Sequence, residues 1–99
     1  MLIGKVVGSV VATRKDEKLQ DRKLLLVQVH DHENRPKEGQ YVVAVDSVGA
    51  GLDDIILYAT GSSARQTTLT ENRPCDAVIM AIVDSWDLGG DNVYEKWTD

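Results

Sequence analysis

The chain has 99 residues, with 11 Lys and Arg against 16 Asp and Glu, which gives a formal net charge of −5. This length predicts one domain with a modest core, and the acidic balance argues against a nucleic-acid partner, because affinity for phosphates comes largely from Lys and Arg. Cys75 is the only cysteine, so an intrachain disulfide is excluded and a reducing compartment fits.

No targeting or membrane segment is expected in this sequence. Its N-terminus lacks the charged start and long apolar stretch of a signal peptide. No apolar run approaches the length of a transmembrane helix. We therefore expect a cytoplasmic protein without membrane contact.

Five apolar runs predict five β-strands and little helix. They cover residues 2–13, 23–30, 41–45, 55–59 and 77–85. Gly4 and Gly8 interrupt the first run, and glycine inside a strand often marks a bulge or a bend. The polar segment 31–40 is expected to be a loop, with Pro36 and Gly39 as its turn residues.

The strands are apolar on both faces. Every residue of 77–83 is apolar, and in 24–29 only Gln28 is polar, whereas an antiparallel sheet with one wet face alternates apolar and polar residues. Five short strands favour a small β-barrel, and an apolar outer face then requires a covering subunit. We therefore expect an obligate oligomer with Ile79 and Ile82 at the subunit interface.

We expect the barrel domain to span residues 1–88 and a C-terminal tail to span 89–99. Tyr94 and Trp97 are three residues apart and would share one face of a helical turn. Large aromatic side chains are seldom left in a disordered polar segment. The tail is therefore expected to dock on a barrel.

The stretch between the third and fourth strands is a glycine loop, residues 47–54. It is small and nearly uncharged until Asp53, whereas a solvent-facing hairpin usually carries Asn-Gly or Asp-Gly. Because glycine permits positive φ and close backbone approach, another surface is expected to pack against this loop. After the fourth strand, Gly61 is a stop signal and Ser62 is expected to cap a short helical turn that ends at Arg65.

The sequence His30-Asp31-His32-Glu33 raises the question of a metal site. In a strand, His30 and His32 would share a face, and zinc accepts histidine and carboxylate ligands. The segment lies at the end of a strand with Pro36 close by, and the chain has no other histidine. A solvated loop is therefore favoured, and no metal is predicted.

Other catalytic patterns are weak, so no enzyme and no cofactor are predicted. Ser62-Ser63 lacks the Gly-x-Ser-x-Gly elbow and an evident base. Gly49-Ala50-Gly51 lacks the spacing of a phosphate-binding fingerprint. Asp53 and Asp54 are adjacent and would point to opposite faces of a strand, which is poor geometry for paired acid–base work.

An ordered set of blocks resembles the EutN/CcmL family of bacterial microcompartment vertex proteins. The set begins with GKVVGSVVAT at residues 4–13, and its other blocks are 23–28, 43–51, 61–65, 76–79 and 82–84. Together they cover roughly residues 1–85. One departure is visible: the family usually continues the glycine loop with Gly-Glu, whereas this chain has Asp53-Asp54.

The resemblance implies a five-stranded barrel related to the oligonucleotide/oligosaccharide-binding fold. It further implies a ring-shaped homopentamer that fills the vertices of a polyhedral shell among hexameric shell proteins, in the cytoplasm. The glycine loop would then face the ring axis. The residues expected at a central opening are Ser47, Gly49, Ala50, Gly51, Asp53 and Asp54, and Arg65 is expected to pair locally or with a neighbouring subunit.

The alternative function is a binding module for single-stranded nucleic acid. Such modules combine a basic groove with aromatic stacking platforms. Here the net charge is negative, Phe is absent, and Trp86, Tyr94 and Trp97 cluster near the C-terminus. A filter-binding assay with single-stranded DNA at low salt would separate the two functions.

Overall fold

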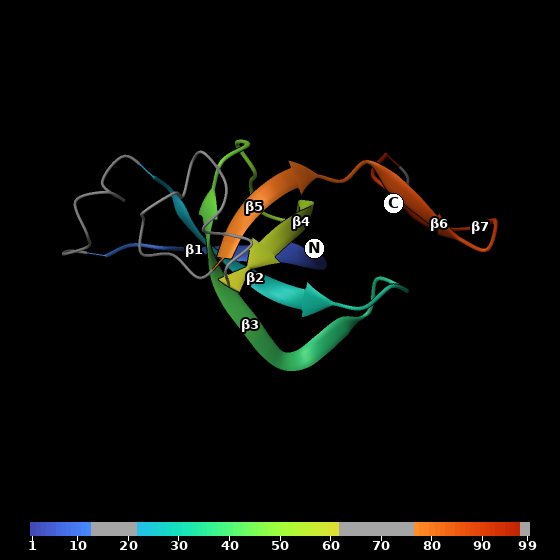
Figure 1. Cartoon of the computed structure of the whole chain (residues 1–99), viewed down its shortest axis with the longest axis horizontal. Helices are drawn as coiled ribbons and strands as arrows, with labels where there is room; N and C mark the ends of the chain where they lie inside the picture. The colour runs from blue at the N-terminus through green and yellow to red at the C-terminus, as the bar shows by residue number, and fades with distance from the viewer. Residues whose placement is uncertain (13–21, 62–76, 98–99) are drawn as a thin grey trace.

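The computed structural model describes residues 1–12, 22–61 and 77–97. Five of the strands in these ranges close into a barrel in the order β1-β2-β3-β5-β4, and two more form a separate hairpin (Figure 1). The barrel strands are β1 (Leu2–Val10), β2 (Leu24–His30), β3 (Pro36–Asp46), β4 (Ile55–Thr60) and β5 (Ala77–Ile82), and the hairpin strands are β6 (Ser85–Leu88) and β7 (Asp91–Glu95). The predicted five-stranded all-β barrel is confirmed. The helical turn predicted from Ser62 to Arg65 lies outside the described residues.

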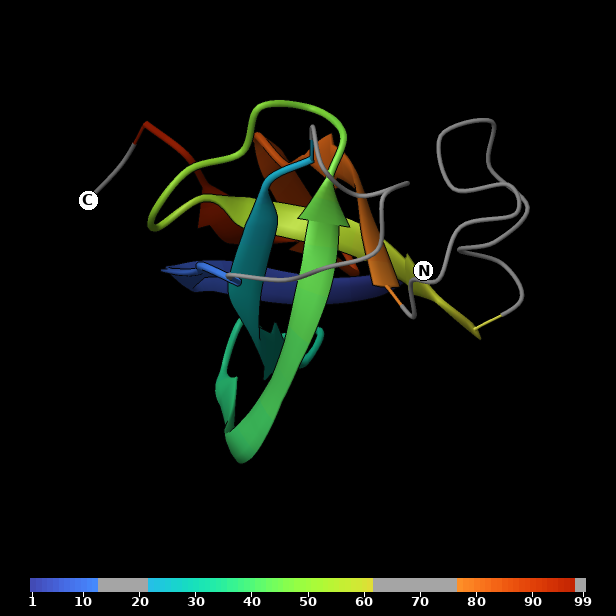
Figure 2. The ribbon, with the colours of Figure 1, turned by 90° about the vertical axis from the view of Figure 1, so that its left-hand side faces the viewer.

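The strand pairings that close the barrel differ in length and direction. β1 pairs antiparallel with both β2 and β4, whereas β3 pairs parallel with β5 only at Val45 and Asp46. Figure 2 shows the long β3 crossing the front of the barrel towards this point. The register of β1 shifts between Val6 and Gly8, which matches the irregularity predicted from the strand glycines. No helix within the described ranges is long and apolar enough to cross a membrane.

Only the first half of the segment 31–40 is a loop. β3 begins at Pro36, which lies opposite His30 of β2, so the loop predicted as far as Gln40 is too long. The turn itself is held by Asp31, whose carboxylate accepts the backbone N–H groups of Glu33 and Arg35 at 2.9 Å each. Residues 36–40 are exposed, so their polarity reports solvent contact rather than the absence of strand pairing.

Both faces of the strands carry buried clusters. The interior cluster contains Tyr58 and Ile79, each fully buried. A second cluster of Val45, Ala59 and Val78 lies on the alternate positions of the same strands. Burial on two faces explains the missing apolar–polar alternation. The hydroxyl of Tyr58 is buried without a hydrogen-bond partner among the described residues, and this burial raises the pKa of Tyr58.

The C-terminal segment is a β-hairpin rather than a strand followed by a helical turn. Gly89 and Gly90 have φ of 61° and 90°, the conformation of a two-residue hairpin turn, so the boundary predicted after residue 88 falls at this turn. Tyr94 lies in β7 with its ring 5.3 Å from that of Trp86, whereas Trp97 is 77% exposed. The predicted shared helical face is therefore wrong.

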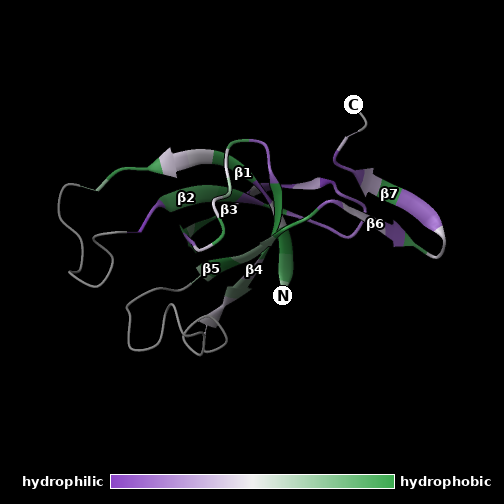
Figure 3. Cartoon of the chain, turned by 90° about the horizontal axis from the view of Figure 1, so that it is seen from above, coloured by the Kyte–Doolittle hydropathy of each residue, from purple (hydrophilic) through white to green (hydrophobic). Residues whose placement is uncertain are grey.

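The hairpin is attached to the barrel through a side-chain contact as well as the chain itself. The indole N–H of Trp86 donates to the carbonyl of His32 at 2.9 Å. Figure 3 shows that the hairpin is more hydrophilic than the barrel strands. The hairpin therefore projects beside the turn between β2 and β3 as a polar arm.

Candidate functional site

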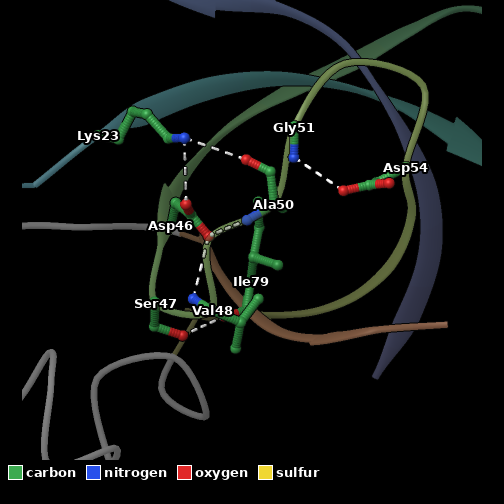
Figure 4. A network of polar contacts seen from close by, with 8 residues as sticks. All are labelled: Lys23, Asp46, Ser47, Val48, Ala50, Gly51, Asp54 and Ile79. Carbon is green, nitrogen blue, oxygen red and sulfur yellow. Dashed lines mark hydrogen bonds and ion pairs between the residues drawn. The ribbon is translucent and has the colours of Figure 1, made fainter.

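The glycine loop between β3 and β4 is fixed by a buried carboxylate. Asp46 ends β3 with only 9% exposure, and its Oδ1 accepts the backbone N–H groups of Val48 and Ala50 at 3.1 and 3.2 Å (Figure 4). Its own N–H donates to the carbonyl of Lys23 at 2.9 Å. The first half of the loop is thus folded back around the Asp46 side chain.

Lys23 joins both ends of this arrangement. Its ammonium donates to the carbonyl of Ala50 at 3.1 Å and lies 3.7 Å from Oδ2 of Asp46 (Figure 4). The ammonium therefore offsets the charge of a carboxylate whose side chain is only 5% exposed. The hydroxyl of Ser47 donates to the carbonyl of Ile79 and ties the loop to β5.

The second half of the loop is bonded to β1. The N–H of Gly51 donates to Oδ2 of Asp54 at 2.8 Å. Val6 exchanges backbone bonds with this region, donating to the carbonyl of Asp54 and accepting from the N–H of Asp53, each at 2.9 Å. Lys5 places its ammonium 3.7 Å from the Asp53 carboxylate. The loop is therefore held by hydrogen bonds as an integral part of this end of the barrel.

The residues predicted to line an opening separate into two groups. Ser47, Gly49 and Asp53 are exposed, and Gly51 and Asp54 are partly exposed. Ala50 is fully buried and packs in the interior cluster, so its side chain cannot line an opening. The apolar character of the loop is thus explained in part by the barrel's own core.

Asp53 occupies the position where the sequence departs from Gly-Glu, and it adopts φ of 70°. This left-handed conformation is open to glycine without penalty. We therefore expect Asp53→Gly to raise the free energy of unfolding by about 1 kcal/mol, since the lost pair with Lys5 is exposed and contributes little. Chemical denaturation checks this, with Asp53→Ala as the control that keeps the strain; equal stabilities of the two variants would contradict it.

The predicted interface residues do not share one environment. Ile79 belongs to the interior cluster and is fully buried, so its side chain serves the core of one barrel rather than a subunit contact. Ile82 is partly buried against the same cluster, and Arg65 lies outside the described residues. The apolar surface that remains exposed includes Tyr41 and Val43 on β3, at 52% and 47%. Their alternation with Val42 and Ala44 is the signal that identifies them.

Of the histidine, serine and cysteine candidates, only the two histidines lie within the described residues. Nδ1 of His30 pairs with Oδ1 of Asn34 at 2.8 Å, while His32 is exposed. Within residues 1–12, 22–61 and 77–97 no three His, Cys, Asp or Glu side chains are grouped as metal ligands. Ser62, Ser63 and Cys75 lie outside these ranges.

Comparisons with known proteins agree over nearly the whole chain. The family model described as "Ethanolamine utilisation protein EutN/carboxysome" matches residues 1–84. The carboxysome shell vertex protein CcmL of Gloeobacter violaceus is 43% identical over 96 residues, covering 97% of this chain and 95% of that protein. The structure of Gloeobacter violaceus CcmL has a TM-score of 0.90, with 97% of this chain and 98% of that chain covered.

Relatives from other microcompartments are similar as well. The shell vertex protein EutN of Salmonella typhimurium is 40% identical over 96 residues, which is 97% of this chain and 96% of that protein. The GrpN pentameric microcompartment shell protein from Rhodospirillum rubrum is 41% identical with a TM-score of 0.80, covering 89% of this chain and 99% of that chain. Sequence and fold thus agree, and the chain belongs to the EutN/CcmL family.

Proposed function

We propose that this chain is a structural subunit of a bacterial microcompartment shell, where it forms homopentameric vertices in the cytoplasm. The observation that carries this proposal is the family match over residues 1–84, together with relatives named as shell vertex proteins and one named as pentameric. These relatives favour a structural role over nucleic-acid binding and over catalysis. Hexameric shell proteins are the proposed neighbours of the ring, because fivefold units among hexagonal tiles make a flat layer curve and close.

Closing a ring requires two different surface patches that meet at each contact. We assign one patch to the outward face of β3, where Tyr41 and Val43 are half exposed. Leu24 and Leu26 of β2 lie opposite Val45 and Val43 and extend this apolar face. Covering such a face drives association.

Replacing Val43 by Glu is expected to dissociate the ring while leaving the barrel folded. The glutamate is solvated in the free subunit but would be buried and unpaired in the interface. Native mass spectrometry at micromolar concentration should show a pentamer for the unsubstituted protein and monomers for Val43→Glu. Gln40→Glu, which adds the same charge at an exposed position of β3, is the matched control and should remain pentameric. A pentameric Val43→Glu protein would contradict this surface assignment, and a stable unsubstituted monomer would contradict the vertex role.

We further propose that the exposed face of the glycine loop lines a central opening of the ring. Support comes from its exposed small residues, Ser47 and Gly49, and from Asp53, whose side chain is 74% exposed. Repeated around a ring, the Asp53 carboxylates, each offset in part by Lys5 at 3.7 Å, would give a weak negative local potential that disfavours anions. A structure of the assembled ring tests this: Gly51 Cα atoms farther from the fivefold axis than the barrel centres would overturn it.

A further inference from the structure

A hollow of about 530 Å³ lies on the outer side of β1 and β2, and its lining residue Gln28 lies opposite Tyr41 of the apolar surface assigned to assembly. Its polar side chains come from five separate segments and are Lys5, Gln28, His30, Asn34, Asp53 and Tyr94. Apolar side chains complete the lining. A concave site with a few convergent polar groups is the usual form of a small-molecule site.

The imidazole of His30 is the most buried polar group of this hollow. Only 8% of His30 is exposed, and its Nδ1 lies 2.8 Å from Oδ1 of Asn34. Because an amide oxygen accepts, Nδ1 carries the hydrogen and Nε2 keeps a lone pair. No hydrogen bond from another described side chain to this ring is present, so in the neutral ring Nε2 is available to accept one from a ligand.

Two residues that line the hollow are held in a conformation unusual for their type. Asn34 and Asp53 have φ of 61° and 70°, and they are the only non-glycine residues with positive φ in the described ranges. They come from different loops, and each is tied down by backbone bonds, Asn34 to Asp31 at 3.0 Å and Asp53 to Val6 at 2.9 Å. Strain of this kind gathers at ligand sites, where the fold holds it in place.

The charges around the hollow favour an uncharged ligand. The ammonium of Lys5 and the carboxylate of Asp53 lie 3.7 Å apart and largely cancel. Burial, with the nearby charges of Asp54 and Asp84, raises the pKa of Tyr94, so its hydroxyl stays protonated. Lys5 and Tyr94 thus supply donors, whereas His30 Nε2 and Asp53 supply acceptors.

We propose that this hollow binds a small uncharged polyol. Neighbouring hydroxyl groups donate to Nε2 of His30 and to Asp53, and the same oxygens accept from Lys5 and Tyr94. The C–H faces of the polyol rest on the apolar lining. This site uses none of the apolar residues assigned to the subunit contact, and it shares Asp53 with the proposed central opening.

Binding is tested by titrating the assembled protein with xylitol and following its NMR spectrum. We expect saturable shifts at Lys5, Gln28 and Tyr94, together with a shift of the His30 Nε2 nitrogen as it gains a donor. Acetate and methylammonium serve as charged probes of similar polarity. Absence of saturable shifts with xylitol, or tighter binding of either charged probe, would overturn the proposal.

Substitution at His30 tests the residue assignment. His30→Phe keeps a planar ring but removes both ring nitrogens, and with them the bond to Asn34 and the acceptor for the ligand. It should weaken xylitol binding at least about tenfold, the effect of one lost buried hydrogen bond. His32→Phe, at the exposed histidine two residues away, is the matched control and should bind as the unsubstituted protein does. If His30→Phe fails to fold, Lys5→Met at a side chain that is 39% exposed replaces it. Unchanged affinity in the folded variant would overturn the site.

Discussion

Replacing Gly4 by alanine is expected to lower the free energy of unfolding by about 3 kcal/mol, because β1 leaves no room for a Cβ atom there. An added Cβ would lie 2.5 Å from Cγ1 of Val27 and 2.9 Å from the carbonyl oxygen of Gln28. It would also lie 3.1 Å from the ring of Tyr58. Since a backbone oxygen cannot rotate away, the strand itself must shift, and a loss of this size is a large part of the stability of a small domain.

Gly8→Ala is the matched control for this prediction. An added Cβ at Gly8 would meet Leu26 at 3.8 Å, which is an ordinary contact, so the stability should change by under about 1 kcal/mol. Tyr58→Phe is a second control: it removes a hydroxyl that has no hydrogen-bond partner in the part of the chain that the structure describes, and it should leave the stability equal or higher. Thermal unfolding at equal protein concentration compares the variants. Equal melting temperatures for the alanine variants at Gly4 and Gly8 would contradict the packing argument.

Replacing Asp46 by alanine is expected to lower the free energy of unfolding by about 2 to 4 kcal/mol and to release the glycine loop. The change removes the acceptor of two backbone N–H groups, those of Val48 and Ala50, and each donor left without a partner costs about 1 to 3 kcal/mol. It also leaves Lys23 with the Ala50 carbonyl as its remaining partner. Amide hydrogen exchange should therefore accelerate at Val48 and Ala50 before it does in β4.

The neutral variant Asp46→Asn separates charge from hydrogen bonding in this network. It keeps one acceptor oxygen, so its stability should fall between those of the unsubstituted protein and the alanine variant. Asp87→Ala removes an exposed carboxylate of the hairpin and should change the stability by less than about 0.5 kcal/mol. An alanine variant at Asp46 with unchanged exchange at Val48 would show that the loop is held by other contacts.

The residue pattern alone was enough to predict the fold class and the position of the glycine loop. Runs of β-branched residues specified the five barrel strands, because such side chains fit a pleated, half-buried surface. The glycines within β1 predicted an irregular strand, and the structure has a register shift between Val6 and Gly8. The ordered blocks from residue 4 to residue 84 also indicated the family that the comparisons confirm.

Which apolar side chains lie inside the barrel depends on how the strands pack. Val78 and Ile79 are both fully buried, yet they belong to clusters on opposite faces of β5. A run without polar residues does not show which of its side chains face inward, so the sequence could not place Ile79 in the barrel interior. The same limit hid the role of Ala50, whose inward position depends on the turn around Asp46.

Tertiary contacts also decided the loop and the C-terminus. Asp53 takes a glycine-like φ of 70° because its N–H is bonded to β1, a constraint between residues far apart in the chain. Trp86 and Tyr94 lie opposite each other in the β6-β7 hairpin. Its strands are too short and too polar to be predicted from hydrophobic pattern. The local sequence pattern specifies which segments are extended. Contacts between distant segments decide which face of the sheet each side chain occupies, because strand register depends on the side chains of the surface packed against it.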